Sequence, residues 1–212
     1  MTRTVSITRA ARASLAIMLL APGCSNLLTQ STTSSYVIID SLQASTGREP
    51  DKLSGVLNSD VLTFVKKDVN GLQVSTPTIF SDNLTATFRL ALKDPGSVES
   101  PTKPSSTNYI TITRYHVTFV RSDGRSTEGV DVPYAFDGAL TATVTTDGAK
   151  AVMTLVRAQA KSEAPLKGLV GSAGPSLSTI AEIIFYGKDQ TGRDVQVVGK
   201  ISVNFADWGD PS

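Results

Sequence analysis

The chain has few of the residues on which metal centres, disulfides and many active sites depend. Its 212 residues include one cysteine and one histidine. A single cysteine cannot form an intrachain disulfide, and one cysteine with one histidine cannot build a zinc site of the usual Cys/His kind. A triad-type hydrolase would need that one histidine, and the Gly-x-Ser-x-Gly elbow is missing. We therefore expect no cofactor and favour a non-catalytic protein.

The chain also has no large excess of positive or negative charge, and it has few aromatic residues. The chain carries 20 basic and 19 acidic side chains, a net charge of +1. Such a balance lacks the basic excess with which proteins hold nucleic acid, so no nucleic-acid partner is expected. Aromatic residues make up 6% of the chain. No apolar run reaches the roughly 20 residues that a membrane-spanning helix needs.

The first 23 residues have a composition of their own. Three arginines and no acidic residue accompany a short apolar run at 15–21, and a small residue, Gly23, ends the segment. A basic start, a short apolar middle and a small residue at the end are typical of a secretory signal peptide. We predict that residues 1–23 are removed on export, which leaves 17 basic and 19 acidic side chains.

The residues around the one cysteine resemble the lipobox of bacterial lipoproteins. The sequence Leu20-Ala21-Pro22-Gly23-Cys24 places a small residue directly before the cysteine, as that motif does. The resemblance implies cleavage after Gly23, a diacylglyceryl group on the sulfur of Cys24, and a lipid bilayer as the partner of that group. Ala21 stands where leucine is usual, and Pro22 is uncommon at the next position.

The residues after Cys24 bear on location and organisation. Ser25 replaces the aspartate that retains enterobacterial lipoproteins in the inner membrane, so the resemblance implies an outer-membrane or cell-surface location. The stretch 26–35 is rich in Ser, Thr and Gln, a composition typical of a flexible tether. The predicted parts are a signal peptide, a lipidated tether and one domain, at 1–23, 24–35 and 36–212. A secretory signal without lipid, or a mitochondrial-type transit peptide, stays open as an alternative.

After the tether, apolar and polar residues alternate with the period of a β-strand. Leu84, Ala86 and Phe88 alternate with Thr85 and Thr87, as in a strand with one buried face. Valine, isoleucine and threonine, which suit a pleated surface, are frequent. We predict an all-β, antiparallel β-sandwich of about seven to nine strands, at 36–44, 60–67, 84–93, 109–121, 140–145, 149–157, 179–187 and 195–205.

Turn residues predict where neighbouring strands join. Asp147-Gly148 is expected to close a hairpin over 140–157, and a turn near Gly192 to close another over 179–205. A further turn is expected at Asp68-Val69-Asn70-Gly71. Such residues supply the backbone conformations that tight turns require.

The remaining segments break the strand pattern. Gly199, on the inward face of the last strand, indicates a bulge or a close backbone approach. A short helix is expected within 159–170. Two long loops, at 93–108 and 161–178, are either functional or mobile connections.

The closing stretch, from Ala181 to Phe205, resembles the last hairpin of bacterial immunoglobulin-like and fibronectin-type modules. Those families commonly end with an aromatic-bearing strand, an Asp/Gly turn and a strand of alternating valines. The resemblance implies an immunoglobulin-like sandwich. The Cys…Trp…Cys hallmark of antibody domains is absent, because the one tryptophan is Trp208, near the end of the chain.

Few polar side chains are candidates for chemistry. The carboxylates Glu128, Asp131 and Asp137 lie close in sequence, and a glycosidase needs only two acids placed by the fold. Asp123, with Glu128 and Asp131, is a weak candidate for calcium, which takes oxygen ligands in extracellular modules. His116 is expected on the strand face opposite its buried neighbours, at the surface.

Aromatic side chains are the candidates for ligand contact. Tyr134, Phe136 and Trp208 could stack against a sugar or a peptide. Tyr134 and Phe136 stand at alternate positions of the segment 132–136, so at least one face of this pair is expected to lie in the core. Packing against the final strand is the alternative for Trp208.

These observations favour an exported, lipid-anchored β-sandwich of the cell envelope with a binding or structural role. An envelope protein or a glycan would be its partner. One alternative is a carbohydrate-active or other envelope enzyme that uses the carboxylates between Glu128 and Asp137. Another is a subunit of a larger envelope assembly that pairs through an exposed edge strand.

Overall fold

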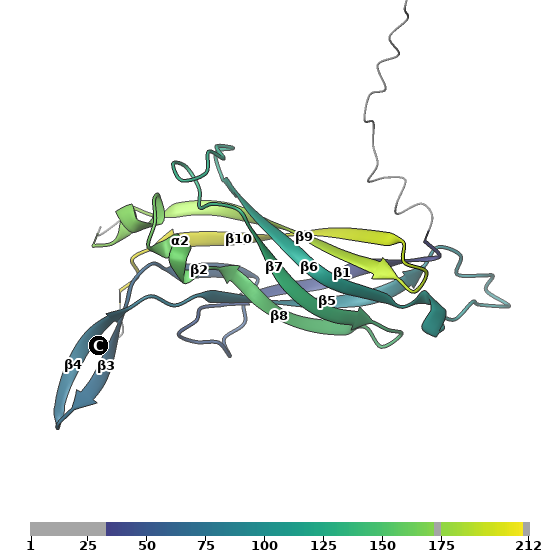
Figure 1. Cartoon of the computed structure of the whole chain (residues 1–212), viewed down its shortest axis with the longest axis horizontal. Coiled ribbons are helices and arrows are strands. Elements are labelled where there is room, and N and C mark those ends of the chain that lie inside the picture. The colour runs from purple at the N-terminus through teal and green to yellow at the C-terminus, as the bar shows by residue number, and fades with distance from the viewer. Residues whose placement is uncertain (1–32, 172–174, 210–212) are drawn as a thin grey trace, which may run out of the picture.

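The alternating segments form strands that account for most of the described chain. The computed structural model describes residues 33–171 and 175–209. The predicted signal peptide up to Gly23, the lipidation candidate Cys24 and most of the predicted tether lie outside the described residues, as does part of the predicted loop at 161–178. Two sheets form the layers of a sandwich (Figure 1), so the predicted all-β sandwich is confirmed.

The two layers differ in width. The smaller sheet has three antiparallel strands, in the order β1 (Ser35–Ser45), β5 (Asp82–Leu92) and β8 (Ala149–Val156). The larger sheet has five, in the order β2 (Val56–Asp60), β10 (Asp194–Ala206), β9 (Leu177–Asp189), β6 (Ile110–Arg121) and β7 (Phe136–Val144). β2 runs parallel to β10, and the other neighbours are antiparallel.

The strand predicted at 60–67 is divided in the structure. β2 ends at Asp60, and β3 (Thr63–Val69) begins a separate hairpin with β4 (Leu72–Thr78). Asp60 stabilises the break, because its Oδ2 accepts a hydrogen bond from Thr63 Oγ1 at 2.8 Å. β4 has no predicted counterpart, since none of its side chains is buried. Of the ten strands in the described residues, eight form the sandwich, within the predicted seven to nine, and β3 and β4 form a separate hairpin.

Burial confirms the predicted alternation and locates the core between the layers. Leu84, Ala86 and Phe88 of β5 are at most 1% exposed. Phe88 meets Phe185 of β9 with ring centroids 5.0 Å apart and ring planes at 84°. Aromatic pairs favour this edge-to-face arrangement. The contact links the two layers directly.

The predicted hairpin over 140–157 is wrong. Gly148 does adopt a left-handed conformation, with a φ of 82°, and its N–H donates to the Thr145 carbonyl in a turn. However, β7 pairs with β6 in the larger sheet, whereas β8 pairs with β5 in the smaller one. The turn therefore carries the chain from one layer to the other. Alternation marks a buried face on each strand but does not specify the neighbouring strand.

The predicted hairpin over 179–205 is confirmed. β9 and β10 pair along their length, with Lys188 opposite Asp194 beside the turn. Asp189 holds the turn, since its Oδ1 accepts hydrogen bonds from the backbone N–H groups of Thr191 and Arg193 at 2.8 and 2.9 Å. Burial raises the pKa of Asp189, but the hydrogen bonds to its carboxylate outweigh burial and lower the pKa overall.

Gly199 of β10 lies at a close approach between the layers. A β-carbon at this position would lie 2.7 Å from Leu42 Cδ1 and 2.9 Å from Ile39 Cδ1 of β1. The register between β9 and β10 continues past Gly199 without a shift. The structure therefore supports the predicted close approach and not a bulge.

The hairpin of β3 and β4 stands away from the sandwich (Figure 1). Its strands meet at Asn70-Gly71, where both residues have positive φ, as a tight Asn-Gly turn requires. One face of the hairpin carries Val69, Leu72 and Val74, which are 51%, 71% and 44% exposed. A two-stranded hairpin without a packed face is marginally stable in water. We call this group of three side chains the hairpin apolar face.

Helices serve only as connections. α2 (Ala158–Lys161) and the 3-10 turn η2 (Leu166–Leu169) lie in the predicted short helix at 159–170. A second 3-10 turn, η1 (Ser106–Asn108), lies at the end of the predicted loop at 93–108. Among the described residues, no helix is long and apolar enough to cross a bilayer.

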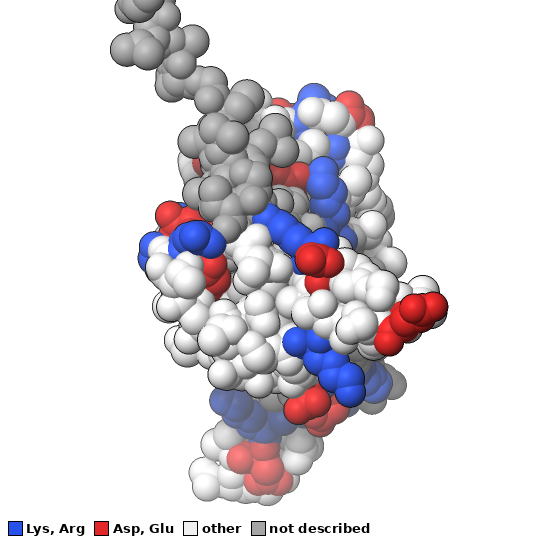
Figure 2. Space-filling view, turned by 90° about the vertical axis from the view of Figure 1, so that its right-hand side faces the viewer, with Lys and Arg blue, Asp and Glu red and all other residues white. Residues whose placement is uncertain are grey.

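The sandwich has two different ends. Ser35 pairs with Leu92 at the end where the described chain enters, and Ser45 pairs with Asn83 at the other. β1 is 11 residues long, so the two ends are about 35 Å apart. Figure 2 shows the entry end, where Lys and Arg are interspersed with Asp and Glu among uncharged side chains. The projecting hairpin lies at the other end, which we call the far end (Figure 1).

The aromatic contact between the layers predicts a large stability difference between two phenylalanines. Phe88→Ala should lower the free energy of unfolding by about 3–5 kcal/mol, because it removes a fully buried ring and leaves a cavity. Phe64→Ala is the matched control, since Phe64 lies on the projecting hairpin and is 43% exposed. Urea denaturation measures both values. Equal losses in the two variants would contradict the assigned core.

Candidate functional site

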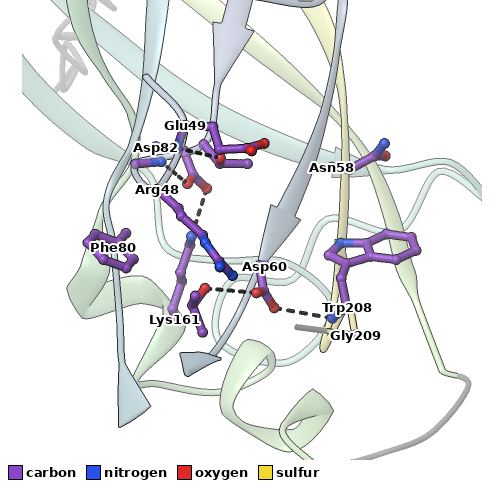
Figure 3. Close-up of a pocket in the computed structure, with 12 residues that line it drawn as sticks. Arg48, Glu49, Asn58, Asp60, Phe80, Asp82, Lys161, Trp208 and Gly209 are labelled. Carbon is purple, nitrogen blue, oxygen red and sulfur yellow. Dashed lines mark hydrogen bonds and ion pairs between the residues drawn. The ribbon is translucent and has the colours of Figure 1, made fainter. Parts of the chain in front are cut away.

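A pocket of about 280 Å³ opens at the far end of the sandwich (Figure 3). Segments that are distant in sequence come together to form it: the chain after β1, the strand β2, the start of β5, the helix α2 and the chain after β10. Its lining side chains are both polar and aromatic, and the residues are Thr46, Gly47, Arg48, Glu49, Asn58, Asp60, Thr63, Phe80, Asp82, Lys161, Trp208 and Gly209.

A buried ion pair forms the floor of the pocket. Lys161 Nζ lies 2.8 Å from Asp82 Oδ2, and each side chain is 1% exposed. Asp82 Oδ2 also accepts a hydrogen bond from Ser59 Oγ at 2.6 Å, and its Oδ1 accepts one from Gly47 N–H at 3.1 Å. Buried charges persist only where partners satisfy them in this way. The pair therefore ties α2 to β5, β2 and the chain after β1.

The burial of Lys161 is not indicated by the sequence. Lys161 lies in the predicted short helix at 159–170 and at the start of the predicted loop at 161–178, and the structure places it, buried, in α2. Asp82, at the start of β5, carries no motif either. Charged side chains usually remain in water, so the sequence around Lys161 or Asp82 gives no local signal of burial.

Trp208 forms one wall of the pocket and is held in place by hydrogen bonds. Its indole N–H donates to the Ser59 carbonyl at 3.2 Å, and its backbone N–H donates to Asp60 Oδ1 at 3.2 Å. The side chain is nevertheless 41% exposed. Figure 3 shows Trp208 and Phe80 flanking the polar side chains of the site. Of the three predicted ligand-contact aromatics, Trp208 is the one that lines this pocket.

Tyr134 and Phe136 lie elsewhere. Phe136 is 8% exposed and packs edge-to-face on Tyr115, with ring centroids 6.2 Å apart. The Arg157 guanidinium lies 4.5 Å from the Phe136 ring centroid, so core groups cover this ring. Tyr134 is 48% exposed. Phe136 therefore belongs to the core, which agrees with the expectation of at least one core residue in this pair, and Tyr134 lies at the surface.

The predicted calcium candidates are engaged with other groups. Arg125 lies between Asp123 and Asp131, at 2.7 Å from Asp123 Oδ2 and 3.4 Å from Asp131 Oδ1. Hydrogen bonding by the Arg125 side chain lowers the pKa of Asp123. Glu128 Oε1 accepts a hydrogen bond from Ala135 N–H at 3.3 Å. In residues 33–171 and 175–209, no group of three or more His, Cys, Asp and Glu side chains could hold a metal ion.

Asp137, the third carboxylate of the enzyme alternative, lies on the exposed side of the larger sheet. Its Oδ1 is 3.1 Å from His116 Nδ1 and 3.6 Å from Arg114 Nη1. Arg114 in turn covers the ring of Tyr186 at 3.8 Å. Asp137 therefore interacts with two basic side chains of β6. Asp131 interacts with Arg125, and Glu128 with the backbone of Ala135. These contacts do not pair the three carboxylates as an acid and a base.

No protein-family model, curated protein or solved structure matches the chain. The pocket at the far end is the place where a rigid aromatic ring, several hydrogen-bonding groups and a recess coincide, which is the usual composition of a ligand site.

The buried ion pair predicts a strong dependence of stability on Lys161. Lys161→Met leaves the Asp82 carboxylate buried without its cation and should cost about 3–5 kcal/mol of unfolding free energy. Lys52→Met is the matched control. It breaks the Lys52–Glu49 pair, whose side chains are 76% and 49% exposed, and should cost about 0–1 kcal/mol.

The combined variant Asp82→Leu/Lys161→Met separates lost pairing from lost packing. Because it removes both buried charges, it should be more stable than Lys161→Met alone in the same urea titration. A double variant that is less stable than the single one would show that the ion pair is not the cause of the loss.

Proposed function

We propose that this protein is an exported, lipid-anchored module of the bacterial cell envelope that binds a partner at its far end and is not an enzyme. Acylated Cys24 would hold it in a bilayer, in the outer membrane or at the cell surface. Two or more acyl chains give stable anchoring, whereas one chain alone binds marginally. The signal-like start of the chain and the small residue before Cys24 support this proposal.

The single structural observation that favours display is the separation of the two ends. The described chain enters beside Ser35, whereas Asp82, Lys161 and Trp208 of the pocket lie at the far end. A domain held in a membrane through its N-terminal side would present the pocket away from that membrane. The entry end carries charges of both signs (Figure 2), so it has no strong electrostatic attraction to anionic lipid.

We further propose that the sandwich is of the immunoglobulin-like type. Its layers have the strand orders β1-β5-β8 and β2-β10-β9-β6-β7. Two packed layers, with alternating inward residues and antiparallel neighbours, are the general form of such modules, and the parallel pairing of β2 with β10 is the one departure among these strands. Modules of this kind serve as binding and display domains, which agrees with a non-catalytic role.

The lipid anchor is tested by the intact mass of the native protein from its producing cell. We expect a mass that begins at Cys24 and includes acyl chains. Cys24→Ser should abolish both the acylation and the cleavage that depends on it. Ser25→Ala is the matched control and should retain the lipid. A mature chain without lipid, or an uncut chain, would overturn the anchor.

The alternative role as a subunit of an envelope assembly is favoured by the hairpin apolar face. Leu72 is 71% exposed, and its neighbours across and along the hairpin are aliphatic. Exposed apolar surface of this kind marks contact sites between proteins when it is contiguous. The partner of this face would be another envelope protein with an apolar surface.

Cross-linking of intact envelope fractions distinguishes the assembly from a monomer. If the hairpin joins subunits, Leu72→Ser should reduce the cross-linked species several-fold. Gln73→Ser is the matched control because Gln73 pairs with Asp68 on the opposite face of the hairpin. A wild-type protein that stays monomeric after cross-linking would exclude the assembly.

A further inference from the structure

We infer that the far-end pocket binds one uncharged sugar unit of an envelope glycan, with its ring stacked on Trp208. This inference rests on the proposed function, because it assumes that the far end is where a partner binds. It specifies the chemical class of that partner and the residues that hold it.

Trp208 has a fixed orientation. Two hydrogen bonds, to the Ser59 carbonyl and to Asp60 Oδ1, hold its indole and backbone. The residue is still 41% exposed, and it lines the pocket. A ring that is already ordered loses little conformational entropy when a ligand packs on it. The C–H face of a pyranose is the apolar surface that such a ring accepts.

Donors and acceptors are mixed beside that ring. The carboxylates of Asp60 and Glu49 already accept hydrogen bonds within the protein and keep further lone pairs, and Arg48 carries a guanidinium group with several donors. Asn58 accepts a hydrogen bond from Asn204 at its Oδ1, and its amide nitrogen carries two donors. A sugar hydroxyl both donates and accepts, so it can use both kinds of group.

Charge in and around the pocket is largely compensated. Lys161 pairs with Asp82 at the floor. The other charged lining side chains are Arg48, Glu49 and Asp60, and Glu49 pairs with Lys52, an exposed residue outside the lining, at 2.6 Å. With Lys52 counted, acids and bases are equal in number, so no large excess of one sign selects an ion and the pocket favours an uncharged polar ligand.

The pocket is small. Its volume of about 280 Å³ lies just below the range for ligand sites, roughly 300–1,000 Å³. This space suits a single ring better than a chain of several. The buried ion pair at the floor keeps the recess in shape, since the segments that line it are joined there.

Trp208 is the one tryptophan of the chain, so its fluorescence reports directly on the pocket. The full processed protein is titrated with glucose, galactose, mannose, N-acetylglucosamine and their disaccharides, with glucuronic acid and glucosamine as charged probes. We expect a saturable change in emission with at least one uncharged sugar. The same sugar should bind more tightly than its charged counterparts.

Variants locate the binding site by calorimetry, which does not depend on the fluorophore. Trp208→Ala and Asn58→Ala should each weaken binding, which raises the Kd about tenfold or more. Tyr134→Ala is the matched control, because Tyr134 is an exposed aromatic residue outside the pocket lining. It should leave the Kd unchanged.

Three results would overturn the inference: no response to any uncharged sugar, tighter binding of the charged probes, or binding that survives Trp208→Ala. These results are independent of the intact mass. A lipidated protein that fails to bind sugar would retain the anchor proposal and lose the sugar site. A protein that binds sugar without lipid would retain the sugar site and lose the anchor.

Discussion

The buried ion pair between Asp82 and Lys161 is the interaction on which the far end of the sandwich depends. Each side chain is removed from water, so each needs the other as a partner. The carboxylate also accepts hydrogen bonds from Ser59 of β2 and Gly47 after β1. One charge pair therefore joins α2 and both layers. The same groups form the floor of the pocket, so the joining of these segments at the far end and the shape of the recess have one physical cause.

The two ends of the molecule differ because different segments meet there. At the entry end, β1 begins beside the end of β5, and Ser35 Oγ donates to the Asn108 carbonyl of η1. At the far end lie the pocket and the separate hairpin of β3 and β4. The proposed anchor and the proposed sugar site use this polarity, with attachment at one end and recognition at the other.

Much of the fold could be predicted from local pattern, and the candidate site could not. Alternation located β5 and β9, turn residues located the Asn70-Gly71 and Gly192 turns, and Gly199 marked a close approach. The same alternation misplaced the connection at Gly148, because a period of two is identical in strands of either sheet. Trp208 was a candidate, but nothing in its neighbourhood indicated Asn58 or Asp60 as its neighbours.

The amino-acid sequence by itself determined where strands and tight turns form, because side-chain period and turn conformation depend on neighbouring residues. The proposed export and the proposed lipid anchor at Cys24 also rest on the sequence by itself, because Cys24 lies outside the described residues. The tertiary structure decided which strands share a sheet, that Lys161 is buried, and that Trp208 faces a recess. These outcomes depend on contacts between distant residues, such as the bond from Trp208 to Ser59, 149 positions away. Only packing of the complete domain brings such residues together.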